Sequence, residues 1–195
     1  MRRTNIREVL RQKMADGLTA APPPLTRRDV RLPEVPRKAL AVIGVRRGGK
    51  TTFLWQCLNG RLAAGAPRES LLFLSLEDDR LDGLESADLA WMVEEYFRAH
   101  PGLRDARTVT FFLDEIQLVP GWETFARRLV DTERLNLFLS GSSARLLSRE
   151  VASSMRGRAL EVLVHPFSFR ETLRHLGVES ESSWNQLPKI GRAHV

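Results

Sequence analysis

The sequence predicts an α/β fold of three layers, in which a mostly parallel sheet of about five strands is flanked by helices. Short apolar segments recur along the chain, and each is followed by a stretch with helical periodicity, an alternation typical of parallel sheets. The apolar segments are nearly uninterrupted, as expected of strands covered on both faces. The five predicted strands are residues 39–43, 71–76, 109–113, 135–139 and 159–164.

Helices are predicted between these strands and at both ends of the chain. Near the start, Thr4 is a candidate cap for a helix over 5–17, in which Ile6, Leu10 and Met14 lie along one face. Near the end, Ser168 and Glu171 form a capping box, the pattern of a helix N-terminus. The helices expected between strands are residues 52–58, 86–100, a helix that opens near 120–122, and about ten residues that include Leu146, Leu147 and Val151.

Composition excludes several classes of protein. No apolar run approaches the roughly 18 residues that span a bilayer, and the first residues lack the apolar segment of a signal peptide, so we expect no membrane and a cytoplasmic location. The single cysteine, Cys57, excludes an internal disulfide and is expected to be a small core side chain. The four histidines lack metal-ligand spacing, so no structural metal is proposed.

Positive charge is concentrated at the start of the chain. Residues 1–40 hold ten Lys and Arg against four Asp and Glu, which accounts for the whole net charge of +6. Three prolines at 22–24 end the first helix, and residues 27–36 contain two more, so this basic segment is expected to be an arm that passes near a bound base. A solvated surface is the simplest interpretation of the arm, and nucleic acid remains open as a partner.

The segment 44–51, Gly-Val-Arg-Arg-Gly-Gly-Lys-Thr, fits the pattern G-x-x-x-x-G-K-[ST] and lies between a predicted strand and a predicted helix. Glycines let such a loop curl so that its N–H groups face phosphate oxygens, while Lys50 reaches the β- and γ-phosphates and Thr51 holds Mg²⁺. The residues expected to contact the nucleotide are Gly44, Val45, Arg46, Arg47, Gly48, Gly49, Lys50, Thr51 and Thr52. The loop therefore predicts a P-loop nucleotide-binding site.

Two carboxylates follow the third predicted strand. Asp114 closes that strand, where it can reach a Mg²⁺ ion held by Thr51. Glu115 is then placed to orient or deprotonate an attacking water. Because parallel strands end at one edge of the sheet, the loop, this pair and the polar residues that follow the fourth strand should meet there.

The remaining candidates are less specific. Ser140, with Ser142 as the runner-up, ends the fourth strand and is a candidate to contact the γ-phosphate or the water. An arginine near the transferred phosphoryl group assists hydrolysis, and the candidates are Arg145, Arg156 and Arg158.

Six motifs together carry a resemblance to a known family. They are Gly-Val-Arg-Arg-Gly-Gly-Lys-Thr-Thr at 44–52, Phe-Leu-Asp-Glu-Ile-Gln at 112–117, Pro-Gly-Trp-Glu at 120–123, Ser-Gly-Ser-Ser at 140–143, Gly-Arg at 157–158 and Pro-Phe-Ser-Phe-Arg-Glu at 166–171. In this order they resemble the prokaryotic AAA-type ATPases in which the ATPase core precedes a second domain of unknown function. The resemblance covers about residues 38–176. It implies an AAA+-like P-loop core, ATP rather than GTP, Glu115 as catalytic base, Ser140 as polar sensor and Arg158 as functional arginine.

The residues and the resemblance together predict Mg²⁺-dependent ATP binding and hydrolysis, as a motor or switch for a further C-terminal domain or in a homo-oligomer. One alternative is a switch that binds nucleotide, hardly hydrolyses it and contacts nucleic acid or a protein. A second is a kinase, which the position of Glu115 disfavours because that residue suits water as the acceptor.

We divide the chain into a helix with a proline-rich basic arm at 1–37, a P-loop core at 38–178 and an unstructured tail at 179–195. The last six residues, 190–195, are what the codons ATC GGA AGA GCA CAC GTC encode, a string that resembles a common sequencing adapter. We therefore expect the tail to be artefactual from about residue 189 and the protein to be truncated.

Overall fold

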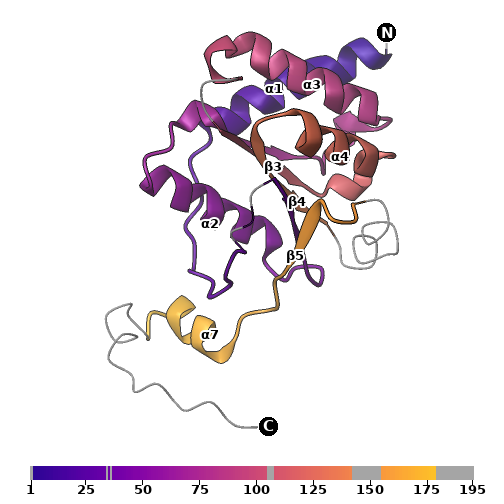
Figure 1. Ribbon diagram of the computed structural model, residues 1–195. Helices are drawn as coiled ribbons and strands as arrows, with labels where there is room; N and C mark the ends of the chain where they lie inside the picture. The colour runs from indigo at the N-terminus through magenta and orange to yellow at the C-terminus, as the bar shows by residue number, and fades with distance from the viewer. Residues whose placement is uncertain (1, 34, 36, 105–107, 142–154, 179–195) are drawn as a thin grey trace.

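The computed structural model describes residues 2–33, 35, 37–104, 108–141 and 155–178 (Figure 1). The helices are α1 (Arg2–Thr19), α2 (Lys50–Ala63), α3 (Ser86–Ala99), α4 (Trp122–Thr132) and α7 (Phe169–His175). The strands are β1 (Ala39–Ile43), β2 (Leu71–Ser75), β3 (Val109–Asp114), β4 (Leu135–Ser140) and β5 (Ala159–Leu163). Within the described ranges, four single 3₁₀ turns lie between the helices and strands, at Arg68–Ser70, Asp79–Leu81, Pro101–Leu103 and Ile116–Leu118.

The five strands form one sheet in the order β2-β3-β4-β1-β5, and all four pairings are parallel. The predicted α/β class and all five predicted strands are thus confirmed, each boundary to within one residue. The helix expected around Leu146 lies outside the described residues. Helix α1 is longer than predicted, so that Thr4 lies inside it rather than at its cap.

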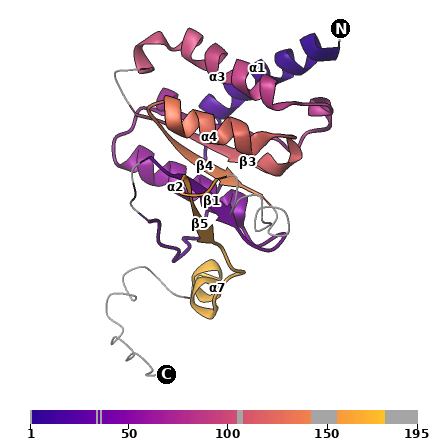
Figure 2. The ribbon, with the colours of Figure 1, turned by 45° about the vertical axis from the view of Figure 1, so that its right-hand side comes forward.

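Alternation along each strand divides the apolar side chains between two cores. In β1, Ala39, Ala41 and Ile43 join the core beneath α1, α3 and α4, whereas Leu40 and Val42 join the core beneath α2. A side-chain period of two residues produces this division. The result is a three-layer molecule with α2 on one face of the sheet and the other long helices on the opposite face (Figures 1 and 2).

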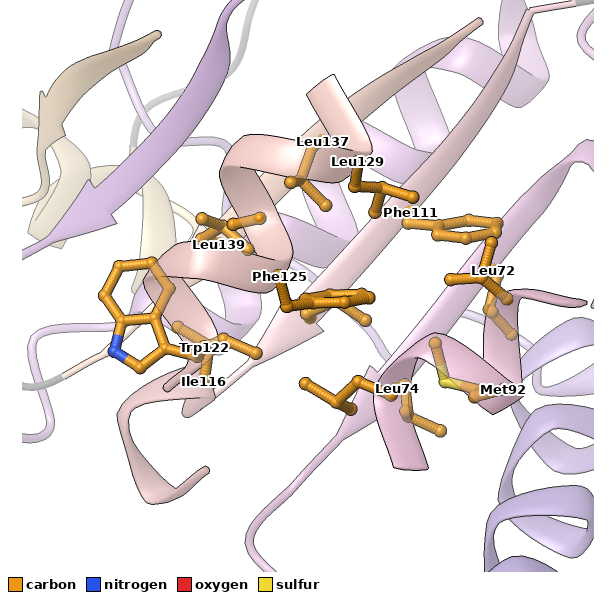
Figure 3. Packing of buried hydrophobic residues seen from close by; sticks show 14 of the residues in the cluster. Leu72, Leu74, Met92, Phe111, Ile116, Trp122, Phe125, Leu129, Leu137 and Leu139 are labelled. Carbon is orange, nitrogen blue, oxygen red and sulfur yellow. The ribbon is translucent and has the colours of Figure 1, made fainter. Parts of the chain in front are cut away.

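The larger core is aromatic and aliphatic and closely packed. Phe125 and Leu129 of α4 lie over the sheet, facing residues of β3 and β4 such as Phe111 and Leu137, and Met92 reaches in from α3 (Figure 3). Helix α1 belongs to the same layer, because its predicted apolar face, which includes Leu10, is buried against this core. The first helix of the chain is therefore packed on the sheet.

Strand register brings the predicted site residues to one edge. Val42 of β1 is level with Ser140 of β4, and Leu113 of β3 is level with Leu139. Asp114, the next residue of β3, therefore ends beside Ser140, while the loop that follows β1 begins two residues after Val42. The carboxyl ends of these three central strands thus form the floor of the candidate site.

Helix α7 lies apart from the two helical layers, at the bottom of Figures 1 and 2. The predicted capping box is present, since the backbone N–H of Glu171 donates to the Ser168 hydroxyl and the Glu171 carboxylate accepts from the backbone of Ser168. Within the described part of the chain, no helix has both the length and the apolar character needed to cross a membrane.

Candidate functional site

The loop between β1 and α2 is held in a curled shape by close backbone contacts. A Cβ atom at Gly44 would lie 2.2 Å from the carbonyl oxygen of Val164, so only glycine fits there. Arg47 and Gly49 both have positive φ, 61° and 89°. Alternation of left- and right-handed residues turns successive N–H groups toward one concavity, which suits an anion. Because α2 begins at Lys50, its N-terminus also faces this concavity.

Lys50 is buried within the loop, with 5% of its surface exposed. Its ammonium group donates to the carbonyl oxygens of Gly44, at 3.2 Å, and Val45, at 3.0 Å. The cation is therefore held among the loop residues that are expected to surround the phosphates. A buried ammonium among neutral carbonyl groups is a strong attractor for a negatively charged ligand.

Asp114 is the centre of a hydrogen-bonded group at the floor of the site. Its Oδ2 accepts from the Thr51 hydroxyl at 2.8 Å, and its Oδ1 accepts from the hydroxyl of Ser140, which is fully buried. Burial raises the pKa of Asp114, and the hydrogen bonds from Ser140 and Thr51 act in the opposite direction. Thr51 and Asp114, which are expected to share a cation, are thus adjacent, and Ser140 donates a hydrogen bond to the other oxygen of Asp114.

Glu115 has an uncommon backbone conformation. Its φ is 57° and its ψ is 43°, in the left-handed region that non-glycine residues rarely adopt, and this bend separates β3 from the 3₁₀ turn at Ile116–Leu118. The backbone N–H of Glu115 donates to Ser140 Oγ at 3.2 Å. The bend lets Asp114 remain in the sheet while the next side chain leaves it, so that the two carboxylates have different surroundings.

The Glu115 side chain borders a cavity of about 610 Å³ at the mouth of the loop. Gln117 also borders the cavity, and its Nε2 donates to the Glu115 carboxylate. Among the described residues, Gln117 Oε1 is the buried side-chain polar atom without a hydrogen-bond partner. The other residues around the cavity are Arg46, Arg47, Gly49, Lys50, Thr51, Thr52, Glu77 and Leu118.

Arg158, expected at the site, lies elsewhere. It precedes β5, and its carbonyl oxygen accepts from the N–H of Ala39, the first residue of β1. The phosphate-binding loop follows the other end of β1, about 16 Å away at roughly 3.3 Å per residue. The Arg158 guanidinium instead pairs with both carboxylate oxygens of Asp131 in α4, at 2.9 Å. Arg156 is two residues before it in the chain, while Arg145 and Ser142 lie outside the described residues.

Two residues at or behind the loop were not predicted from the sequence. Gln117 belongs to a motif that we quoted, and its spacing of two from Glu115 was the available signal. Arg28 is buried against the back of the loop, and nothing in an arginine-rich arm distinguishes it from its neighbours. The arm therefore contacts the loop itself, through Arg28, which belongs to the segment 27–36 expected near a bound base.

Comparisons with known proteins agree with this geometry. A family model described as an AAA domain matches residues 36–173. The uncharacterized protein MJ1544 of Methanocaldococcus jannaschii is 34% identical over 162 residues, which cover 83% of this chain and 34% of that protein. An uncharacterized protein of Haemophilus influenzae is 31% identical over 142 residues, 72% of this chain and 34% of that protein.

The chain thus spans about a third of the length of these curated relatives. Among solved structures, the chain is similar to PCH-2 of C. elegans, with 14% identity and a TM-score of 0.41. The alignment covers 95% of this chain and 49% of the PCH-2 chain. Because the family model matches well over half of the sequence, this chain belongs to the AAA domain family of P-loop nucleotide-binding proteins.

Proposed function

We propose that this chain binds ATP together with Mg²⁺ and hydrolyses it, and that it serves as the motor or switch of a longer protein. One observation carries the proposal. Thr51, Asp114 and Ser140 form a single hydrogen-bonded group beside a buried Lys50, and Glu115 borders the same cavity as Lys50 and Thr51. Binding and hydrolysis of a nucleoside triphosphate need these groups at one edge of a sheet.

The residues present fit Mg²⁺. A hydroxyl and a carboxylate, 2.8 Å apart, supply the hard oxygen ligands that this ion prefers. No cluster of three or more His, Cys, Asp or Glu side chains suited to a metal occurs within the described ranges. The protein would contribute two ligands, Thr51 and Asp114. Mg²⁺ suits such a site because it usually keeps several water ligands and binds phosphate oxygens of the nucleotide.

Each protein group has a distinct task in the proposed reaction. Lys50 and the N–H groups of the loop bind the phosphates, and Ser140 fixes the orientation of Asp114. When bound, Mg²⁺ neutralises charge on the β- and γ-phosphate oxygens. Glu115 accepts a proton from the attacking water while the water oxygen forms a bond to the γ-phosphorus. The bond from that phosphorus to the bridging oxygen breaks, and its electron pair leaves with ADP.

Two substitutions test the proposal. Lys50→Ala is expected to abolish ATP binding, and Glu115→Gln to preserve binding while blocking phosphate release, because the amide cannot accept the proton. Binding is measured by calorimetry and turnover by phosphate release, with Glu8→Gln as control because this carboxylate lies exposed on α1. Undiminished turnover in Glu115→Gln would refute the role of Glu115.

A second candidate function is a nucleotide-dependent binding switch with negligible hydrolysis. The position of Arg158 favours it, since that arginine does not reach the loop of its own chain and Arg46 and Arg47 are the arginines around the cavity in the described residues. Turnover would then need a group supplied by a neighbouring molecule or by nucleic acid. Phosphate release measured over a range of protein concentrations, with and without DNA, separates the two functions.

A further inference from the structure

Arg28 is a buried cation that joins three segments behind the phosphate-binding loop. Its side chain is 2% exposed, and its Nε donates to Oε1 of Glu171 at 3.0 Å. Its Nη1 donates to the carbonyl oxygen of Gly48 at 3.0 Å, and its Nη2 donates to the carbonyl oxygen of His165. The guanidinium also lies 4.8 Å from the ring centroid of Phe167. Arg28 thus contacts the loop, the segment after β5 and helix α7.

The contact with Gly48 fixes the orientation of one peptide group. In a trans peptide, the carbonyl of Gly48 and the N–H of Gly49 point in opposite directions. The described peptide bonds contain no cis bond, so the rule applies here. Because the carbonyl points back to Arg28, the N–H points away from Arg28. Gly49 borders the cavity and is the N-cap of α2, so its N–H is expected to face the phosphates.

Close packing leaves Arg28 little freedom to release that carbonyl. A Cβ atom at Gly49 would lie 2.7 Å from Arg28 Nη1, so the guanidinium lies against the Cα of Gly49. The backbone of Arg28 is also fixed from another side, because its N–H donates to Gln56 Oε1 at 2.7 Å and its carbonyl accepts from Gln56 Nε2 at 3.1 Å. Gln56 belongs to α2, the helix that directly follows the loop.

Glu171 is the counter-charge that lets an arginine remain buried here. Its Oε1 accepts from Arg28 Nε and from the backbone N–H of Asp29, and its Oε2 accepts from the backbone of Ser168. A buried guanidinium without such a partner would be costly. The Glu171 charge therefore lowers the cost of burying Arg28, whereas Arg28 is the member of the pair that contacts the loop.

We propose that Arg28 is a positioning residue for phosphate binding, which aims the Gly49 N–H at the phosphates by holding the Gly48 carbonyl. This inference rests on the proposed nucleotide binding. It also gives the basic arm a function within its own chain. The Arg28–Glu171 pair would link α7 to the phosphate-binding loop.

The test compares three variants of the full chain by calorimetric titration with ATP and Mg²⁺ and by thermal unfolding. Arg28→Met removes the donor to Gly48 and leaves Glu171 unpaired. The double variant Arg28→Met, Glu171→Gln removes the same donor and leaves no buried charge, while the side-chain amide at position 171 can still accept a backbone N–H. Glu171→Gln retains Arg28 and its contact with Gly48. Arg31→Met, an exposed arginine of the same arm, is the matched control.

The expected result is that both variants without Arg28 bind ATP about tenfold more weakly or worse, the scale of losing a hydrogen bond from a charged donor. Glu171→Gln is expected to unfold at a lower temperature yet to bind ATP within about threefold of the unsubstituted chain. Full binding by the folded double variant would overturn the inference alone. Absence of ATP binding by the unsubstituted chain would overturn the proposed function and the inference with it.

Discussion

The Thr51 hydroxyl donates to Asp114 Oδ2 at 2.8 Å, which joins the first turn of α2 to the end of β3 across 63 residues of sequence. The two side chains expected to hold one Mg²⁺ are thus already adjacent. Ser140 holds the other oxygen of the same carboxylate from the end of β4. Two separate elements, α2 and β4, therefore converge on Asp114 at the end of β3, and the site depends on the register of the sheet.

Ser140→Ala should weaken the use of Mg²⁺ without removing a ligand. Its hydroxyl supports the Asp114 carboxylate and accepts the N–H of Glu115, so its loss frees the carboxylate to rotate. Removing such a supporting partner costs about 10- to 100-fold in metal affinity. The measurement is the Mg²⁺ concentration that half-saturates ATP binding. Thr132→Ala, a hydroxyl on α4 that donates to the carbonyl oxygen of Arg128, is the control, and an unchanged midpoint in Ser140→Ala would contradict the role of Ser140.

Gln117→Ala should lower turnover while leaving ATP affinity intact. Its amide holds the Glu115 carboxylate, and it contacts neither Lys50 nor Asp114 in the described hydrogen bonds. Displacement of a catalytic group by about 1 Å costs on the order of 100-fold in rate. We expect kcat for phosphate release to fall at least tenfold with KM within a factor of about three. Equal losses in ATP affinity and rate would show a general defect of the cavity.

The fold was predictable because its signals are local. Each strand is a short, mostly apolar run, and β2, β3 and β4 end at polar residues, as Asp114 ends β3. The loop at 44–51 predicts the strand before it and the helix after it. The carboxylate pair and Ser140 were predictable in turn, because parallel strands deliver their carboxyl ends to one edge.

The features that could not be predicted from the sequence depend on contacts between distant residues or on backbone conformation. Arg28 and Glu171 are 143 residues apart, and no periodicity relates the two positions. Arg158 was assigned from its motif, but an arginine that precedes a parallel strand lies at the opposite edge from the loop. The left-handed backbone of Glu115 is equally hidden, since its residue type does not favour that conformation.

Cys57 should react slowly with thiol reagents while the protein is folded. Burial raises the pKa of its thiol to about 12, and the nearby charge of Arg61 acts in the opposite direction. The thiolate is the reactive form, so at pH 8 only about one thiol in 10⁴ would be ionised. Alkylation by iodoacetamide, followed by mass spectrometry, should become rapid only in denaturant. Rapid alkylation of the native chain would show that α2 opens.

Glu171 should contribute stability above about pH 4.5 that is lost as the pH falls toward 2. Burial alone raises its pKa, but hydrogen bonds from the backbone of Ser168 and Asp29 and from the Arg28 side chain outweigh it and hold the pKa at about 2, below the ordinary value of 4.5. A carboxyl group whose pKa is lower in the folded chain favours folding wherever the unfolded chain would also be ionised. Glu171→Gln should therefore cost about 1–3 kcal/mol in the free energy of unfolding at pH 7. In urea titrations this difference should shrink steadily below pH 4.5 and approach zero near pH 2. Glu8→Gln, a substitution of an exposed carboxylate, is the control, and a pH-independent difference for Glu171→Gln would show that the loss arises from packing rather than from charge.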